Sequence, residues 1–301
     1  VLQTPGGTGG VRVAADFVAN LMRGSRIWVS NPTWANHKNI FAAAGVEVAD
    51  YTYLDAARTG LDLDGMLADL ANAAPRDVVL LHACCHNPTG VDPSPQQWQA
   101  IADILVQRQL LPLVDFAYQG FGAGLNEDAA GLRAILQSCE EAIVASSFSK
   151  NFGLYSERVG AVSVVAADAD AKQSAHSQLK RLIRSNYSNP PRHGASIVAT
   201  VLQDDALRQQ WTDELSAMRS RIAEMRKQFV SGMQSRVPDQ DFSFIKAQNG
   251  MFSFSGLNAM QVDKLRSQHS VYIVGSGRIN VAGITPSNVD RLCDAIATVI
   301  T

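Results

Sequence analysis

The sequence predicts an α/β protein in which helices cover a mostly parallel β-sheet and a smaller α+β domain follows. Two observations predict this. Short apolar runs alternate with amphipathic stretches as far as Arg192, which is typical of parallel strands joined by helices. Beyond Arg192 the alternation stops, and longer helical patterns are mixed with few strand-like runs. A chain of 301 residues is long enough for two domains.

Each element of the first part follows from the spacing of its apolar residues. Strands of a helix-covered parallel sheet are short continuous apolar runs, whereas the helices carry an apolar stripe. Strands are expected at residues 26–30, 47–51, 78–83, 111–115, 142–146 and 159–165, and helices at 11–22, 34–44, 63–72, 95–107 and 129–139.

The second part has a different pattern. Helices are expected at residues 195–203 and 205–235, the second long and charged on one side. A β-hairpin is expected over 242–254, around Gln248-Asn249-Gly250. A helix at 259–269, strands near 271–274 and 279–282, and a helix at 286–300 complete the chain. We expect residues 1–217 to form a large domain and 218–301 to belong to a smaller one.

The composition excludes several classes of protein. With 46% hydrophobic and 18% charged residues, the chain is typical of ordinary soluble proteins. The net charge is −2 without a basic stripe, which argues against nucleic-acid binding. No apolar run approaches the roughly 18 residues of a membrane span, and no signal peptide is visible. Cys84, Cys85, Cys139 and Cys293 lack disulfide or metal spacing, so we expect reduced cysteines, no metal and a cytoplasmic location.

Lys150 is the lysine with the most informative surroundings. An apolar run ends in serines and Lys150 follows, so the amine is expected at the rim of a buried strand. Burial there lowers the pKa of the amine, which can then form a Schiff base with a carbonyl. Pyridoxal phosphate is the commonest partner of this kind. A structural loop lysine is the alternative, but Asp115 and Tyr118 end a similar strand earlier in the chain.

Polar and aromatic residues after the other strands suit the same cofactor. Asp115 would pair with a pyridinium nitrogen and keep the ring protonated, although a capping role is the alternative. Tyr118 and Asn87 would hydrogen-bond the ring's phenolic oxygen, although the Asn-Pro-Thr-Gly segment of Asn87 is also turn-forming. Trp34 offers a flat face for stacking or a core side chain. His37 either orients Asp115 or packs as a neutral core residue.

A glycine cluster at residues 6–10 opens the first helix. Glycines let backbone N–H groups approach an anion, and a helix N-terminus favours negative charge. A simple capping loop explains the cluster equally well. The cluster is neither G-x-G-x-x-G after a strand nor a P-loop, so a nicotinamide dehydrogenase is disfavoured.

Three arginines are candidates for binding anions. Arg158 lies close enough in sequence to serve a phosphate beside Ser147 and Ser149. Arg184 precedes a rigid turn, and Arg278 follows Gly277, which leaves room for a ligand. Guanidinium groups bind carboxylates through two hydrogen bonds, although a solvated surface role is the default for any single arginine.

These residues, in this order and spacing, resemble the aspartate aminotransferase family, class I enzymes of fold type I that use pyridoxal phosphate. The resemblance covers nearly the whole chain. It rests on seven segments: Gly7-Thr8-Gly9, Asn31-Pro-x-Trp34-x-Asn-His37, His86-Asn-Pro-Thr-Gly90, Asp115-Phe-Ala-Tyr-Gln-Gly120, Ser147-x-Ser-Lys150-Asn-Phe-Gly153, Tyr187-Ser-Asn-Pro-Pro191 and Ser276-Gly-Arg278.

The resemblance implies a role for each candidate residue. Lys150 would hold pyridoxal 5'-phosphate as a Schiff base and then act as general base and acid, with Asp115 and Tyr118 as its catalytic partners. Trp34 and Asn87 would contact both cofactor and substrate. Arg278 would bind the substrate α-carboxylate, and Arg184 the second carboxylate in the neighbouring active site of a homodimer. The cofactor phosphate would be held by Gly7, Thr8, Ser147, Ser149 and Arg158.

The implied reaction is amino transfer from L-aspartate to 2-oxoglutarate, giving oxaloacetate and L-glutamate. The implied partners are dicarboxylic amino acids and 2-oxo acids, with no nucleic acid and no membrane. The chain begins about a hundred residues later than members of the family. Gly6 also stands where many relatives have serine. Two alternatives therefore stay open: an aromatic amino acid aminotransferase, and an inactive truncated fragment.

Overall fold

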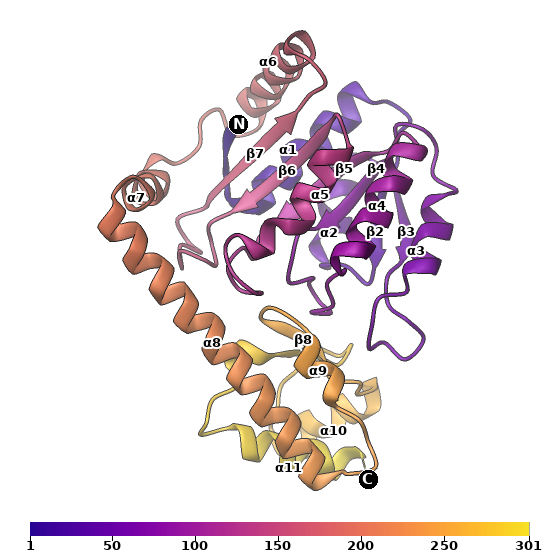
Figure 1. Ribbon diagram of the computed structural model, residues 1–301, viewed down its shortest axis with the longest axis vertical. Helices are drawn as coiled ribbons and strands as arrows, with labels where there is room; N and C mark the ends of the chain where they lie inside the picture. Colours follow the sequence, from indigo (N-terminus) through magenta and orange to yellow (C-terminus); the bar gives the residue numbers. More distant parts are fainter. Residues whose placement is uncertain (301) are drawn as a thin grey trace.

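The computed structural model describes residues 1–300 and contains a seven-stranded sheet in the order β1-β7-β6-β5-β4-β2-β3 (Figure 1). Strands β2 to β6 run parallel to one another, while β7 pairs antiparallel with both β6 and β1. The strands are β1 (Leu2–Pro5), β2 (Ile27–Asn31), β3 (Val48–Thr52), β4 (Val78–His82), β5 (Leu111–Phe116), β6 (Ala142–Ser147) and β7 (Val159–Val165).

Helices cover both faces of this sheet, which explains why the central strands are continuous apolar runs. One face packs against α1 (Gly6–Leu21), α2 (Asn36–Ala43) and α6 (Ala169–Asn186). The other packs against α3 (Leu63–Leu70), α4 (Pro95–Gln107) and α5 (Ala130–Ser138). Every residue of β4 is buried.

A long helix leads from this sheet to the second part of the chain (Figure 1). After α7 (Arg192–Gln203), α8 (Asp205–Arg236) runs to a smaller group of elements. These are α9 (Ser243–Ala247), β8 (Phe252–Phe254), α10 (Ala259–His269), β9 (Arg278–Asn280) and α11 (Val289–Ile300).

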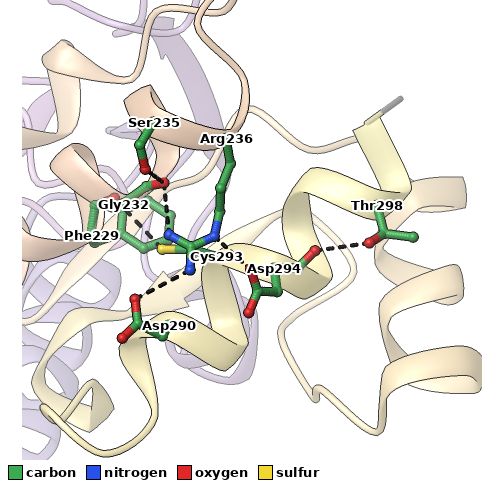
Figure 2. A network of polar contacts seen from close by, with 8 residues as sticks. All are labelled: Phe229, Gly232, Ser235, Arg236, Asp290, Cys293, Asp294 and Thr298. Carbon is green, nitrogen blue, oxygen red and sulfur yellow. Dashed lines mark hydrogen bonds and ion pairs between the residues drawn. The ribbon is translucent and has the colours of Figure 1, made fainter.

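The last helix is fastened to the end of α8, as Figure 2 shows. Arg236 binds Asp294 at 2.6 Å and Asp290 at 3.2 Å, and both acids lie on α11. The Cys293 thiol donates to the carbonyl of Phe229 at 3.7 Å. The C-terminal helix therefore packs on the second half of α8.

The predicted α/β class is confirmed, and two local expectations are wrong. The hairpin over 242–254 is replaced by α9 and by β8, which pairs with the distant β9. Residues 271–274 form no strand, because Tyr272 and Val274 are exposed and have no neighbouring strand. The sequence reasoning also missed β1 and α6. In α6 only Leu179 and Ile183 are buried, so its apolar stripe is weak.

None of the helices within residues 1–300 combines the length and the apolarity needed to cross a bilayer.

Candidate active site

Asp115 lies near the carboxyl end of β5, where it is buried close to His37 and His82 from two other elements. His37 on α2 binds its Oδ2 through Nε2 at 3.0 Å, and Thr33 binds the other ring nitrogen at 2.8 Å. Burial by itself would raise the pKa of Asp115. The hydrogen bond from His37 and the charges of His37 and Lys150 outweigh it, so the pKa lies below its ordinary value. The site therefore holds an ionised, oriented carboxylate.

His82 ends β4 and packs beside this pair, with its ring 5.2 Å from that of His37. Burial, together with the charge of His37, lowers the pKa of His82 to about 3. Neither of its ring nitrogens has a hydrogen-bond partner within the described residues. His82 is thus a neutral imidazole beside the carboxylate. It was not among the residues expected from the sequence. Its place at the end of a buried strand was the available signal.

Lys150 follows β6, the strand beside β5. Its Nζ lies 4.6 Å from the centre of the Tyr118 ring. Burial lowers the pKa of Lys150; Asp115 opposes this shift and Arg158 adds to it. A larger share of the amine is consequently uncharged than for an exposed lysine, as a nucleophilic role requires.

The first helix presents a free N-terminus beside Ser147 and Arg158. No side chain caps α1, so its first N–H groups are available to a ligand. A methyl group on Gly7 would lie 2.8 Å from the Cβ of Ser147, and one on Gly6 would lie 3.0 Å from the Cζ of Arg158. Only glycine leaves room here for an anion held by helix amides and a guanidinium.

The other predicted phosphate ligands lie in α1 itself and in the loops beside its N-terminus. Thr8 is the third residue of α1. The buried Ser149 donates its backbone N–H to the hydroxyl of Ser147 at 3.3 Å. Arg158 is held in place by the carbonyl of Tyr155 at 2.6 Å. The expected phosphate ligands are thus gathered at one point.

A second group joins the two parts of the chain. The amide of Asn87 donates to the Tyr118 hydroxyl at 3.3 Å and accepts from Arg278 at 3.2 Å. Burial raises the pKa of Tyr118, so its hydroxyl remains a donor. The guanidinium of Arg278 lies 4.4 Å from the centre of the Phe252 ring. The sequence did not indicate Phe252 as a site residue, because it was expected to lie in a hairpin over 242–254 that does not form.

Two predicted site residues, Trp34 and Arg184, make fewer contacts with the other candidates. Trp34 is half-buried and touches His37 edge-on, with ring centres 5.1 Å apart. Arg184 is exposed on α6 and binds Ser188 at 2.9 Å. No polar contact within residues 1–300 joins Arg184 to any other candidate residue. The structure thus gathers the candidates except Arg184.

The comparison with known proteins identifies the family. Residues 1–296 match the model of the aminotransferase class I and II family. The chain belongs to this family. Both the resemblance seen in the sequence and the predicted enzyme class, an aminotransferase, are confirmed.

Several aminotransferases are similar over almost the whole chain. The aspartate aminotransferases of Salmonella typhi and Escherichia coli (strain K12) are 58% and 57% identical over 298 residues, which are 99% of this chain and 75% of theirs. The aromatic-amino-acid aminotransferase of Escherichia coli (strain K12) is 48% identical over 299 residues, again 99% and 75%.

Solved aminotransferase structures share the fold. The aromatic-amino-acid aminotransferase from Burkholderia pseudomallei, covalently bound to pyridoxal phosphate, superimposes with a TM-score of 0.96 at 47% identity, covering 99% of this chain and 75% of that one. The aspartate aminotransferase from Saccharomyces cerevisiae cytoplasm gives 0.96 at 37% identity, with 99% and 74% covered.

Proposed function

We propose that this aminotransferase catalyses pyridoxal-phosphate-dependent transfer of an amino group from L-aspartate to 2-oxoglutarate. One observation carries the proposal. Lys150, with its lowered pKa, follows β6, and the ionised Asp115 lies near the carboxyl end of the neighbouring β5, so both stand at the same edge of the sheet. The higher identity to the aspartate enzymes than to the aromatic one supports aspartate as the substrate.

The cofactor supplies an aldehyde that captures amino groups reversibly and a ring that takes up electron density. Lys150 is the amine that holds it and then moves the substrate α-proton. Asp115, oriented by His37, holds a proton on the ring nitrogen. Asn87 and Tyr118 donate hydrogen bonds to the ring's phenolic oxygen.

The phosphate of the cofactor fits the free N-terminus of α1. Its ligands are Gly7 and Thr8 through the helix amides, Ser147 and Ser149 through hydroxyl groups, and Arg158 through its guanidinium. The space that the glycines leave open supports this assignment.

Three further residues would contact the substrate or the cofactor ring. Arg278, already aligned by Asn87, binds the α-carboxylate. Trp34 would stack on the flat face of the cofactor ring. Arg184, exposed on its own subunit, binds the second carboxylate in the active site of its partner in a homodimer.

The proposal also includes the domain boundaries and the cellular location. Residues 1–217 form the large cofactor-binding domain and residues 218–301 the C-terminal part of a small domain. The four free cysteines are all buried, which fits a reducing, cytoplasmic compartment.

The covalent role of Lys150 is tested by absorbance and mass. The purified chain, loaded with cofactor and treated with borohydride, should gain the cofactor's mass on the peptide that contains Lys150. The Lys150→Ala variant should lose this modification and the near-ultraviolet absorbance of the Schiff base. A chain that transfers no amino group when fully loaded would support the inactive-fragment alternative.

A second candidate is an aromatic amino acid aminotransferase, supported by the 47% identity to the solved aromatic enzyme from Burkholderia pseudomallei. Arg184→Leu distinguishes the two. It should reduce kcat/KM for aspartate about tenfold or more, since a charged hydrogen bond contributes about 1.5–3 kcal/mol. Turnover of phenylalanine should change little. Equal losses for both substrates would remove the role of Arg184.

A further inference from the structure

A cavity of about 190 Å³ lies away from the candidate active site, between α8 and the segment that leads into β8. Four of the residues that line it are positively charged: Arg219, Arg226, Lys227 and Lys246. No carboxylate lines it. It is large enough for several water molecules or one small anion.

The positive charges are poorly neutralised. Arg226 is only 3% exposed, yet it binds neutral groups alone: the carbonyls of Ile245, Gly250 and Phe252 and the hydroxyl of Ser253. Burial lowers the pKa of Arg226 to about 10, so it remains charged at neutral pH. A buried charge without a counter-ion is costly.

The neighbouring cations also lack carboxylate partners. Arg219 binds the carbonyl of Gly120 and the hydroxyl of Ser216. Throughout residues 1–300, no acidic side chain forms an ion pair with Arg219, Arg226 or Lys246. Lys227 has only the exposed Glu224, at 4.0 Å.

Asp92, whose charge does act on Arg226, is occupied elsewhere. It accepts hydrogen bonds from the backbone of Cys85 and His86 and from the side chain of Asn249. The cavity therefore keeps a net positive potential that an anion would offset.

Gln248 identifies the kind of anion. Its side chain is 95% buried, being 5% exposed, and lines the cavity. Neither its amide oxygen nor its amide nitrogen has a partner among the described residues. A ligand that satisfies both atoms must offer an acceptor and a donor, because the amide nitrogen donates and the amide oxygen accepts. Monohydrogen phosphate has both, whereas sulfate and dicarboxylates at neutral pH have acceptors only.

We propose that this cavity is a phosphate-binding site, occupied by inorganic phosphate. The chain segment 248–250, which lines the cavity, continues to the candidate active site. The backbone N–H of Asn249 binds the carbonyl of Gly90 at 2.7 Å, and the chain continues to Phe252 beneath Arg278. A bound phosphate would hold this segment in place and so act on the position of Arg278.

The test uses the cofactor-loaded protein, in which the cofactor occupies the N-terminus of α1, with excess succinate to occupy Arg278. Inorganic phosphate is titrated and its binding followed by the width of its phosphorus NMR signal. Binding should be saturable and weakened about tenfold or more in Lys246→Gln, since a charge-assisted hydrogen bond is lost. Lys246 is exposed, so this variant should fold.

Lys264→Gln is the matched control, because it removes the same charge from an exposed site on α10, outside the cavity. It should bind phosphate as the unchanged protein does. Methyl phosphate is the second probe. At neutral pH it is mainly a dianion without a P–OH donor, so it should bind more weakly than inorganic phosphate. Sulfate, which also has acceptors only, should likewise bind more weakly than inorganic phosphate. Absence of saturable binding, equal binding by Lys246→Gln, or equal affinity for sulfate would overturn the proposal.

Discussion

Gly160 on β7 is predicted to control cofactor binding although it carries no functional group. It lies against the backbone at the start of α1. A methyl group on Gly160 would be 2.6 Å from the carbonyl oxygen of Gly6 and 2.8 Å from the nitrogen of Gly7. Both are backbone atoms, so no side chain can rotate away. In Gly160→Ala the start of the helix must retreat from the strand.

The size of the effect follows from these distances. Ordinary van der Waals contact begins at 3.4 Å and the carbonyl carbon of Gly6 lies nearer still, so the loop must move by about 0.6–1 Å. Misplacing a binding group by about 1 Å can cost roughly 100-fold in rate, so we expect a 10- to 100-fold loss in cofactor affinity and in kcat/KM. Overpacking should also reduce the free energy of unfolding by about 1–3 kcal/mol.

The assay compares Gly160→Ala with Gly24→Ala. Gly24 has φ +87° and nothing within 4 Å of an added methyl group, so alanine there introduces backbone strain alone. That strain should cost about 1–2 kcal/mol of stability and leave cofactor affinity unchanged. Cofactor binding is measured by absorbance titration of the cofactor-free protein, and stability by urea unfolding. If Gly160→Ala keeps its cofactor affinity within threefold, the steric reasoning is wrong.

Two further predictions concern side chains. His37→Leu removes the 3.0 Å hydrogen bond that helps to hold the pKa of Asp115 below 3.8. Burial then raises this pKa. A carboxylate is ionised above its pKa and becomes protonated as the pH falls through it, so in the variant Asp115 becomes protonated at a higher pH. The acid limb of the activity profile should therefore move upward, and an unchanged limb would contradict the role of His37. Arg236→Ala removes exposed ion pairs to Asp290 and Asp294, and urea unfolding should show a loss of about 1 kcal/mol or less. A loss of several kcal/mol would contradict the weakness assigned to these pairs.

The sheet could be predicted because its strands are buried on both faces. A continuous apolar run such as 78–82 has few other places in a folded chain, and all six expected strands are present. The elements after α8 were harder to predict. Gly250, at φ +78°, turns the chain against Cys85, and β8 pairs with a strand far away in sequence. Local patterns do not encode such long-range pairing.

The sequence by itself determined the family, the order of the strands along the chain and the identity of most candidate residues, because these depend on residue type and spacing. Only the tertiary structure decided that His82 is a neutral partner beside Asp115, and that Arg278 reaches Asn87 across 191 residues. It alone revealed the positively charged cavity beside Gln248. Burial and distance depend on how separate segments pack, and packing sets the pKa values and contacts on which the chemistry depends.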